Sequence, residues 1–315
     1  MMNRMLVLAP ERWDEACFAA PAVRALAASG LAVGVLCAPE QSAFWETLVG
    51  IRVIASAEQV DGADWDAALA WQDGPLLRPA RAAGISRRLA PAGNRRLEKW
   101  ATDTIAPETH VLEHRVRYFL ASVEQLGIAT RDAAFFAPAT INTTRADHPA
   151  VLLAPESDFG PSHDWPLQRW IGLATWLHDT HGPAMAVAGN GGTGGRAKAL
   201  YDAIHGKCGE VAEINFTPDT DGLRTLARFP VVVASDGSLP HLAAHTGATC
   251  VVLFGPNDAA WRRPLGRRHE VVRHHVECAP CLMPKCPLDM RCQERLAVDE
   301  VRRAADACMR RTSAG

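Results

Sequence analysis

The sequence lacks an excess of charge of either sign. It has 33 lysines and arginines against 35 aspartates and glutamates, which gives a formal net charge of -2 and a pI of about 6.6. Domains that bind nucleic acid usually carry a basic excess, so the composition argues against a nucleic-acid partner. Any anionic ligand has to be met by a local group of basic side chains.

Long apolar runs are also missing. No segment approaches the roughly 18 consecutive apolar residues of a membrane-spanning helix. The apolar run near the N-terminus is short and is followed by Pro10, Glu11 and Arg12, which is not the pattern of a signal peptide. We therefore expect a cytoplasmic protein without a transmembrane segment, whose thiols are reduced.

The length and composition predict a globular protein with two domains. Hydrophobic residues make up 48% of the chain and charged residues 22%. A chain of 315 residues is too long for one ordinary core and suits two domains of roughly 150 residues each. Two domains imply a cleft between them.

Apolar runs alternate with segments of helical period, which is typical of parallel sheets with crossover helices. We expect strands at 5–8, 32–37, 53–55, 65–70, 151–154, 185–188, 231–234 and 250–254. Helices are expected near 16–29, 110–126, 167–178 and 239–246. The polar stretch 136–149 contains two prolines and suits a linker, so we place the domain boundary between 147 and 148.

Three segments combine a buried strand with polar residues at its end. The first leads from the strand at 5–8 to Asp14 and Glu15, with Pro21 six residues after Glu15. The second, residues 153–170, contains Ser157, Phe159-Gly160-Pro161, His163, Asp164 and Trp165-Pro166. The third, residues 231–244, contains Asp236, Gly237, Ser238 and His241. A tight turn from a strand into a helix presents free N–H groups that suit a diphosphate.

Taken in order, these segments resemble glycosyltransferase family 9, the ADP-heptose:lipopolysaccharide heptosyltransferases, over nearly the whole chain. The resemblance implies an α/β fold of the GT-B type, with two Rossmann-like domains whose parallel sheets face a central cleft. Residues 1–147 would form the acceptor domain, and residues 148–315 the nucleotide-sugar donor domain. The amphipathic segment 299–311 could pack back on the N-terminal domain.

The resemblance also implies a reaction. A heptose or related sugar would pass from a nucleotide sugar, ADP-heptose, to a lipopolysaccharide-core or other glycan acceptor in one inverting step. Glu15 would accept the proton, and no cofactor or catalytic metal would be needed. The donor would be bound by Ser157, His163, Asp236, Gly237, Ser238 and His241. Because the family's acceptors are membrane lipids, the protein could work peripherally at the inner membrane.

Several positions depart from the family pattern. Asp14 replaces a glycine, His163 a lysine and Asp164 an arginine, and Gly237 and Ser238 are exchanged. Loss of two positive charges weakens the attraction for a diphosphate. Two alternatives therefore stay open, a relative that binds a nucleotide or sugar without transferring it and a transferase with a different nucleotide sugar. Each carboxylate also has a local interpretation, since acidic side chains favour the first turn and the N-cap of a helix.

Basic residues gather between 78 and 99 in a stretch interrupted by prolines and glycine. A solvated loop is one interpretation of this pattern. The other is a site for an anionic glycolipid or glycan acceptor, because guanidinium groups bind carboxylate and phosphate in bidentate fashion. The candidate acceptor-binding residues are Arg78, Arg81, Arg87 and Arg88.

Four of the nine cysteines lie close together near the C-terminus, at Cys278, Cys281, Cys286 and Cys292. A CxxC pair with two further cysteines in an intracellular chain has the character of a zinc site. The spacing is tighter than in an ordinary zinc ribbon, so reduced or paired cysteines remain the alternative. A zinc ion here would be structural and would not take part in transfer.

Overall fold

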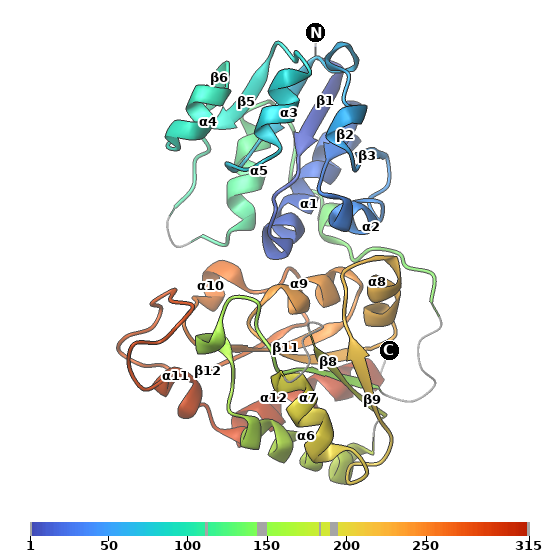
Figure 1. Ribbon diagram of the computed structural model, residues 1–315, viewed down its shortest axis with the longest axis vertical. Coiled ribbons are helices and arrows are strands. Elements are labelled where there is room, and N and C mark those ends of the chain that lie inside the picture. Colours follow the sequence, from blue (N-terminus) through green and yellow to red (C-terminus); the bar gives the residue numbers. More distant parts are fainter. Residues whose placement is uncertain (1, 111–112, 144–149, 183, 190–194, 314–315) are drawn as a thin grey trace. The chain divides into compact units, whose positions relative to one another are not determined.

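The structure, a computed structural model, describes residues 2–110, 113–143, 150–182, 184–189 and 195–313. The chain divides into two compact units (Figure 1). The first unit contains residues 1–139 and 218–220, and the second contains residues 140–217 and 221–315. The boundary expected between 147 and 148 lies outside the described residues.

The first unit is built on a six-stranded parallel sheet in the order β3-β2-β1-β4-β5-β6. Its strands are β1 Arg4–Leu8, β2 Ala32–Leu36, β3 Ile51–Ile54, β4 Ala67–Ala70, β5 Arg88–Pro91 and β6 Asp103–Ile105. The central strands β1 and β4 are almost entirely apolar and buried, as expected where helices cover both faces of a sheet.

Helices connect these strands. They are α1 Trp13–Ala28, α2 Ser42–Trp45, α3 Leu77–Ala82, α4 Arg95–Trp100 and α5 Val116–Glu124, with short 3-10 turns at Pro39–Gln41, Ala57–Gln59, Gly62–Asp64 and Ala133–Phe136. Helix α1 is rich in alanine, buries most of its length and packs against α5 (Figure 1). Its first turn holds two carboxylates, which the helix dipole favours.

The second unit is built on another six-stranded parallel sheet, in the order β12-β11-β10-β7-β8-β9. Its strands are β7 Val151–Ala154, β8 Met185–Gly189, β9 Val211–Asn215, β10 Val231–Ser235, β11 Thr249–Phe254 and β12 Glu270–Arg273. Its helices are α6 Leu167–His181, α7 Arg196–Ile204, α8 Thr220–Ala227, α9 Ser238–His245, α10 Ala259–Arg262, α11 Arg291–Glu294 and α12 Val298–Ser313, with a 3-10 turn at Pro161–His163.

The core of the second unit contains two buried tryptophans. Trp165 and Trp170 meet edge to face, with ring centroids 5.4 Å apart, and Leu173 is buried beside them. The last helix, α12, packs on this core against β10, β11 and α6 (Figure 1). This helix contributes Val301, Ala305 and Cys308 to the second core, and its packing on the first unit stays a prediction.

Because each sheet is parallel, the ends of its strands share one edge. In the first sheet Leu8 pairs with both Leu36 and Ala70, and in the second Ala154 pairs with Ala234. Ligands of open α/β sheets bind beyond this carboxyl edge. Within the described residues no helix is long and apolar enough to cross a membrane.

Candidate functional site

Glu15 lies in the first turn of α1, just beyond the carboxyl end of β1. It is 3% exposed, and two side chains hold its carboxylate. Nε of Arg115 donates to both oxygens, at 3.2 and 2.9 Å, and Nε2 of Gln72 donates to Oε2 at 2.7 Å. The carboxylate is therefore oriented by an ion pair and a second donor at the edge where a ligand would bind.

Arg115 is itself held in place by aromatic contacts. Its guanidinium lies over the ring of Tyr118, 4.1 Å from the centroid, and the Tyr118 hydroxyl donates to the backbone oxygen of Trp71 at 2.8 Å. Burial raises the pKa of Tyr118 to about 12, so its hydroxyl stays a donor at neutral pH. The segment of Trp71 and Gln72 and the start of α5 thus build one cluster around Glu15.

Asp14, which the sequence resemblance places where the family has a glycine, is also paired. Its side chain is fully buried, and Arg12 reaches it with two hydrogen bonds, Nε to Oδ1 at 3.1 Å and Nη2 to Oδ2 at 3.2 Å. This bidentate pair fixes the turn that leads into α1.

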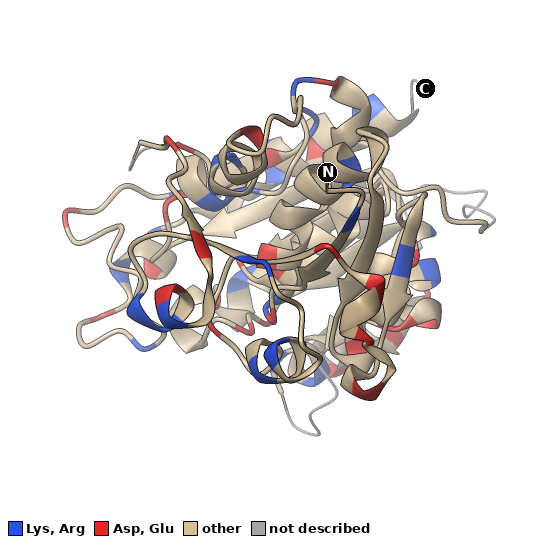
Figure 2. Cartoon of the chain, turned by 90° about the horizontal axis from the view of Figure 1, so that it is seen from above, with Lys and Arg blue, Asp and Glu red and all other residues tan. Residues whose placement is uncertain are grey.

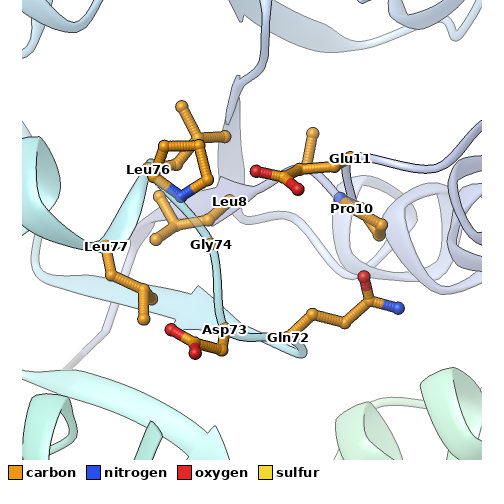
Figure 3. A pocket seen from close by; sticks show the side chains of 10 residues that line it. Leu8, Pro10, Glu11, Gln72, Asp73, Gly74, Leu76 and Leu77 are labelled. Atoms are coloured by element: carbon orange, nitrogen blue, oxygen red, sulfur yellow. The ribbon is translucent and has the colours of Figure 1, made fainter. Parts of the chain in front are cut away.

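A pocket of about 270 Å³, including the open space at its mouth, lies beside this cluster at the ends of β1 and β4 (Figure 3). Glu11, Gln72 and Asp73 supply its polar lining, and Leu8 and Leu76 are among its apolar residues. In Figure 3 the carboxylate of Glu11 points toward the side of Leu8 and Leu76. Gln72 connects the two features, because it lines the pocket and donates to Glu15.

The four arginines predicted to bind the acceptor do not gather at this edge. Arg88 donates to the backbone oxygens of Ile85 and Trp100, at 2.7 and 2.8 Å, and Arg87 is paired with Asp103 at 3.7 Å. Both precede or begin β5, so they lie at the amino edge of the parallel sheet, opposite the end of β1. Arg78 and Arg81 are exposed on α3.

Other arginines do lie at the carboxyl edge. Arg96, at the start of α4, is paired with Asp73 of the pocket at 2.9 Å. Arg12 and Arg115, whose ion pairs are described above, also lie at this edge. Figure 2 shows basic and acidic positions interspersed along the helices and loops. The basic stretch of the sequence is thus divided between two edges, and Arg87 and Arg96 are each paired with a carboxylate.

In the second unit, the loop that follows β7 meets the start of α9. The Ser157 hydroxyl donates to the backbone oxygen of Asp236 at 2.5 Å. The N–H of Ser238, the first residue of α9, donates to Oδ1 of Asp158 at 2.7 Å. The sequence predicted that Ser157 and Ser238 would lie together, but not that Asp158 would reach the helix.

Asp236 joins three loops through its side chain. Its Oδ2 meets Nδ1 of His163 at 3.1 Å and accepts from Nδ2 of Asn257 at 2.7 Å. Asp236 is completely buried and His163 is 2% exposed. Burial raises the pKa of Asp236, while the hydrogen bonds from His163 and Asn257 oppose that shift. The hydrogen bonds of Asp236 hold the loops that carry His163 and Asn257 together at the carboxyl edge of the second sheet.

The remaining positions predicted for the donor lie on the same elements. Gly237 directly precedes α9, and His241 is buried one turn into that helix. Asp164, which the sequence resemblance places where the family has an arginine, accepts from the N–H of Ser157 at 2.9 Å and is paired with Arg196 at 3.5 Å. Burial raises the pKa of Asp164. Sequence reasoning missed Arg196, which brings a positive charge to this loop.

The structure does not assemble a zinc site from the four cysteines. Cys281 is exposed, whereas Cys292 is buried, with Sγ packed against Gly255. All four are free thiols, and the described part of the chain contains no group of three or more His, Cys, Asp or Glu side chains arranged to hold a metal. The short spacing thus keeps the four cysteines in one segment of the chain.

Two α/β units with parallel six-stranded sheets have the GT-B fold, and solved structures share this fold over nearly the whole chain. The E. coli ADP-heptose lps heptosyltransferase II has a TM-score of 0.77 and 16% identity, with 98% of this chain and 99% of that chain covered. E. coli heptosyltransferase WaaC with ADP has a TM-score of 0.75 and 14% identity, covering 97% and 99%. A family 9 glycosyl transferase from Veillonella parvula has a TM-score of 0.78 and 12% identity, covering 98% and 97%.

The family follows from the sequence itself. The model of glycosyltransferase family 9 (heptosyltransferase) matches residues 93–291, which is more than half of the chain. The chain therefore belongs to glycosyltransferase family 9. No curated protein matches its sequence significantly.

Proposed function

We propose that this chain transfers a heptose or a related sugar from a nucleotide sugar, ADP-heptose, to a hydroxyl of a glycan acceptor with inversion at C1. The observation that carries the proposal is the buried Glu15 carboxylate, held by Arg115 and Gln72 beside a pocket at the carboxyl edge of the first sheet. Family membership and the likeness to a heptosyltransferase solved with ADP support the choice of donor.

On the acceptor side, Glu15 is the general base. The acceptor oxygen attacks C1 of the sugar, the bond from C1 to the diphosphate breaks, and the acceptor proton passes to the Glu15 carboxylate. Arg115 and Gln72 fix the direction of the carboxylate, because both donate hydrogen bonds to it. An anionic glycolipid acceptor would meet Arg12 and Arg96 at the same edge, rather than Arg87 and Arg88.

On the donor side, the diphosphate binds at the start of α9. The free N–H groups and the dipole of a helix N-terminus stabilise negative charge on the leaving group without a catalytic metal. Gly237 permits a close approach, and Ser157, Ser238 and His241 belong to the same edge. Asp236 and His163 act by holding the surrounding loops in position.

The test of this mechanism is turnover by a Glu15→Gln variant. Loss of a general base typically lowers the rate by about 10²- to 10⁴-fold, so kcat for ADP-heptose should fall by at least 100-fold. The exposed Glu40, in the same unit, gives a matched control, and Glu40→Gln should keep full turnover. A Glu15→Gln variant with wild-type kcat would remove Glu15 from this role.

A second candidate is a family member that binds a nucleotide without transferring the sugar. The observation that favours it is the carboxylate of Asp158 at the start of α9, where the proposal places a diphosphate. Thermal unfolding with ADP-heptose and with ADP, UDP and GDP sugars separates the cases, since a ligand at 100 times its Kd stabilises by about 2.7 kcal/mol. A stabilising shift without any turnover would support this second candidate.

A further inference from the structure

Two carboxylates from one loop occupy the starts of two helices in the second unit. The loop, residues 155–160, follows β7 at the carboxyl edge. Oε1 of Glu156 accepts from the N–H of Ala197 in the first turn of α7 at 2.8 Å. Oδ1 of Asp158 accepts from the N–H of Ser238 at the first position of α9 at 2.7 Å. Each helix therefore has an anionic oxygen at its positive end, supplied by the chain itself.

Glycines make the room for both carboxylates. A Cβ at Gly237 would lie 2.8 Å from Oδ1 of Asp158, and a Cβ at Gly195 would lie 2.2 Å from Oε1 of Glu156. Gly237 has an extended backbone, so glycine is needed there for space and not for its φ angle. Gly237 thus accommodates Asp158, because a side chain at 237 would force that carboxylate to shift.

The start of α9 has few backbone N–H groups that can donate to a ligand. Its first three residues are Ser238, Leu239 and Pro240, and proline has no N–H. Two backbone donors therefore remain in these positions, and Asp158 already takes that of Ser238. A diphosphate at this helix would need the same donors and the same space, and it would be repelled by a carboxylate a few ångströms away.

We propose that Asp158 is an internal anion that lowers the affinity for the donor by competing with its diphosphate for the N-terminus of α9. The inference rests on the donor site of the proposed function. When a nucleotide sugar binds, the Asp158 carboxylate leaves the Ser238 N–H and the phosphate oxygen takes its place. Asp158 therefore weakens every ligand that carries a diphosphate, while it leaves contacts to the nucleoside unchanged.

The experiment compares ADP with adenosine by calorimetric titration of the full chain. Asp158→Asn keeps an oxygen that can accept from Ser238 but removes the charge, and Asp158→Ala also removes the acceptor. Both variants should bind ADP at least tenfold more tightly than the wild type, with Asp158→Ala the tighter, whereas the Kd for adenosine should change less than twofold. Glu156→Gln removes one charge from the same loop at the other helix, and its Kd for ADP should change less than threefold.

The outcomes distinguish a failure of the competition by Asp158 from a failure of the proposed donor site. If the wild type binds ADP and Asp158→Asn binds it with the same affinity, Asp158 does not compete and the inference is overturned, while the donor site stands. If neither the wild type nor either Asp158 variant binds ADP, the donor site at α9 is overturned and the inference falls with it. Circular dichroism spectra that match the wild type confirm that each variant is folded.

Discussion

Replacing Arg115 with methionine removes the guanidinium that donates to both oxygens of Glu15. The Glu15 side chain is 5% exposed and that of Arg115 is 21% exposed, so the pair is largely, though not fully, withdrawn from water. Breaking a buried ion pair by removal of one partner costs about 3–5 kcal/mol. The partial exposure of Arg115 and the remaining donor Gln72 reduce this, and we expect a loss of about 2 kcal/mol in the free energy of unfolding of the first unit.

A double-mutant cycle tests the origin of that loss. Arg115→Met, Glu15→Gln and the double variant are unfolded in urea and followed by circular dichroism. If the two side chains stabilise each other, the coupling energy should be about 1–2 kcal/mol, within the range for residues in direct contact. Single effects that add to within about 0.5 kcal/mol would refute the assignment of Arg115 as the partner of Glu15.

Substitutions at Arg115 also distinguish a role in orienting Glu15 from a role in stabilising the fold. Arg115→Lys keeps the charge but not the planar group that spans both oxygens, so it should restore stability better than it restores kcat. If Arg115 orients the base, kcat should fall in both variants while KM for ADP-heptose stays the same, because the donor binds to the other unit in the proposed mechanism. If kcat instead fell in proportion to the loss in the free energy of unfolding across the series, the role of Arg115 would be purely structural.

Three further predictions concern the second unit. Burial raises the pKa of Asp236, so the folded state favours the protonated carboxyl. The contribution of Asp236 to the free energy of unfolding should therefore be lost as pH rises from about 4 toward the folded pKa. Urea unfolding of Asp236→Asn at several pH values should lack this decline in the free energy of unfolding. Gly237→Ala should destabilise by about 1–3 kcal/mol through its contact with Asp158, and combining it with Asp158→Ala should recover most of that loss in urea unfolding. Leu173→Ala should cost about 2–5 kcal/mol, since Leu173 is fully buried in the second core, and a thermal shift below 1 °C would contradict this packing.

Most strands inside the sheets could be predicted from the sequence, whereas the edge strands β6, β9 and β12 and the inner strand β5 could not. The apolar runs at 151–154, 231–234 and 250–254 correspond to β7, β10 and β11. Strands β5, β6, β9 and β12 were not predicted, because each carries charged residues, namely Arg88, Asp103, Glu213 and Glu270. An edge or peripheral strand buries less surface, so its pattern is weaker.

The candidate site was predicted where its residues follow one another along the chain. The strand-to-helix turns correctly placed Glu15 in the first turn of α1 and Ser238 at the start of α9. The partners of these residues come from distant segments, Arg115 100 positions after Glu15 and Asp158 80 positions before Ser238. Such pairs depend on tertiary packing and have no local signal in one sequence.

The grouping of Arg78, Arg81, Arg87 and Arg88 as acceptor-binding residues stays a prediction, although the structure does not hold the four together. These residues are close in the chain, but α3 leads away from the carboxyl edge and β5 starts at the amino edge, so Arg87 and Arg88 are carried away from Glu15. The cysteines between 278 and 292 are likewise near in sequence without forming a metal site in the described structure.

The most direct test of the account is a transfer assay with purified wild-type chain, ADP-heptose and a heptose-free lipopolysaccharide core as acceptor, in which ADP release and the glycosylated product are measured together. The account predicts equal amounts of ADP and product, inverted configuration at C1, and at least a 100-fold loss of rate in Glu15→Gln. Binding of ADP-heptose without product, in the wild type and in Asp158→Asn alike, would contradict it.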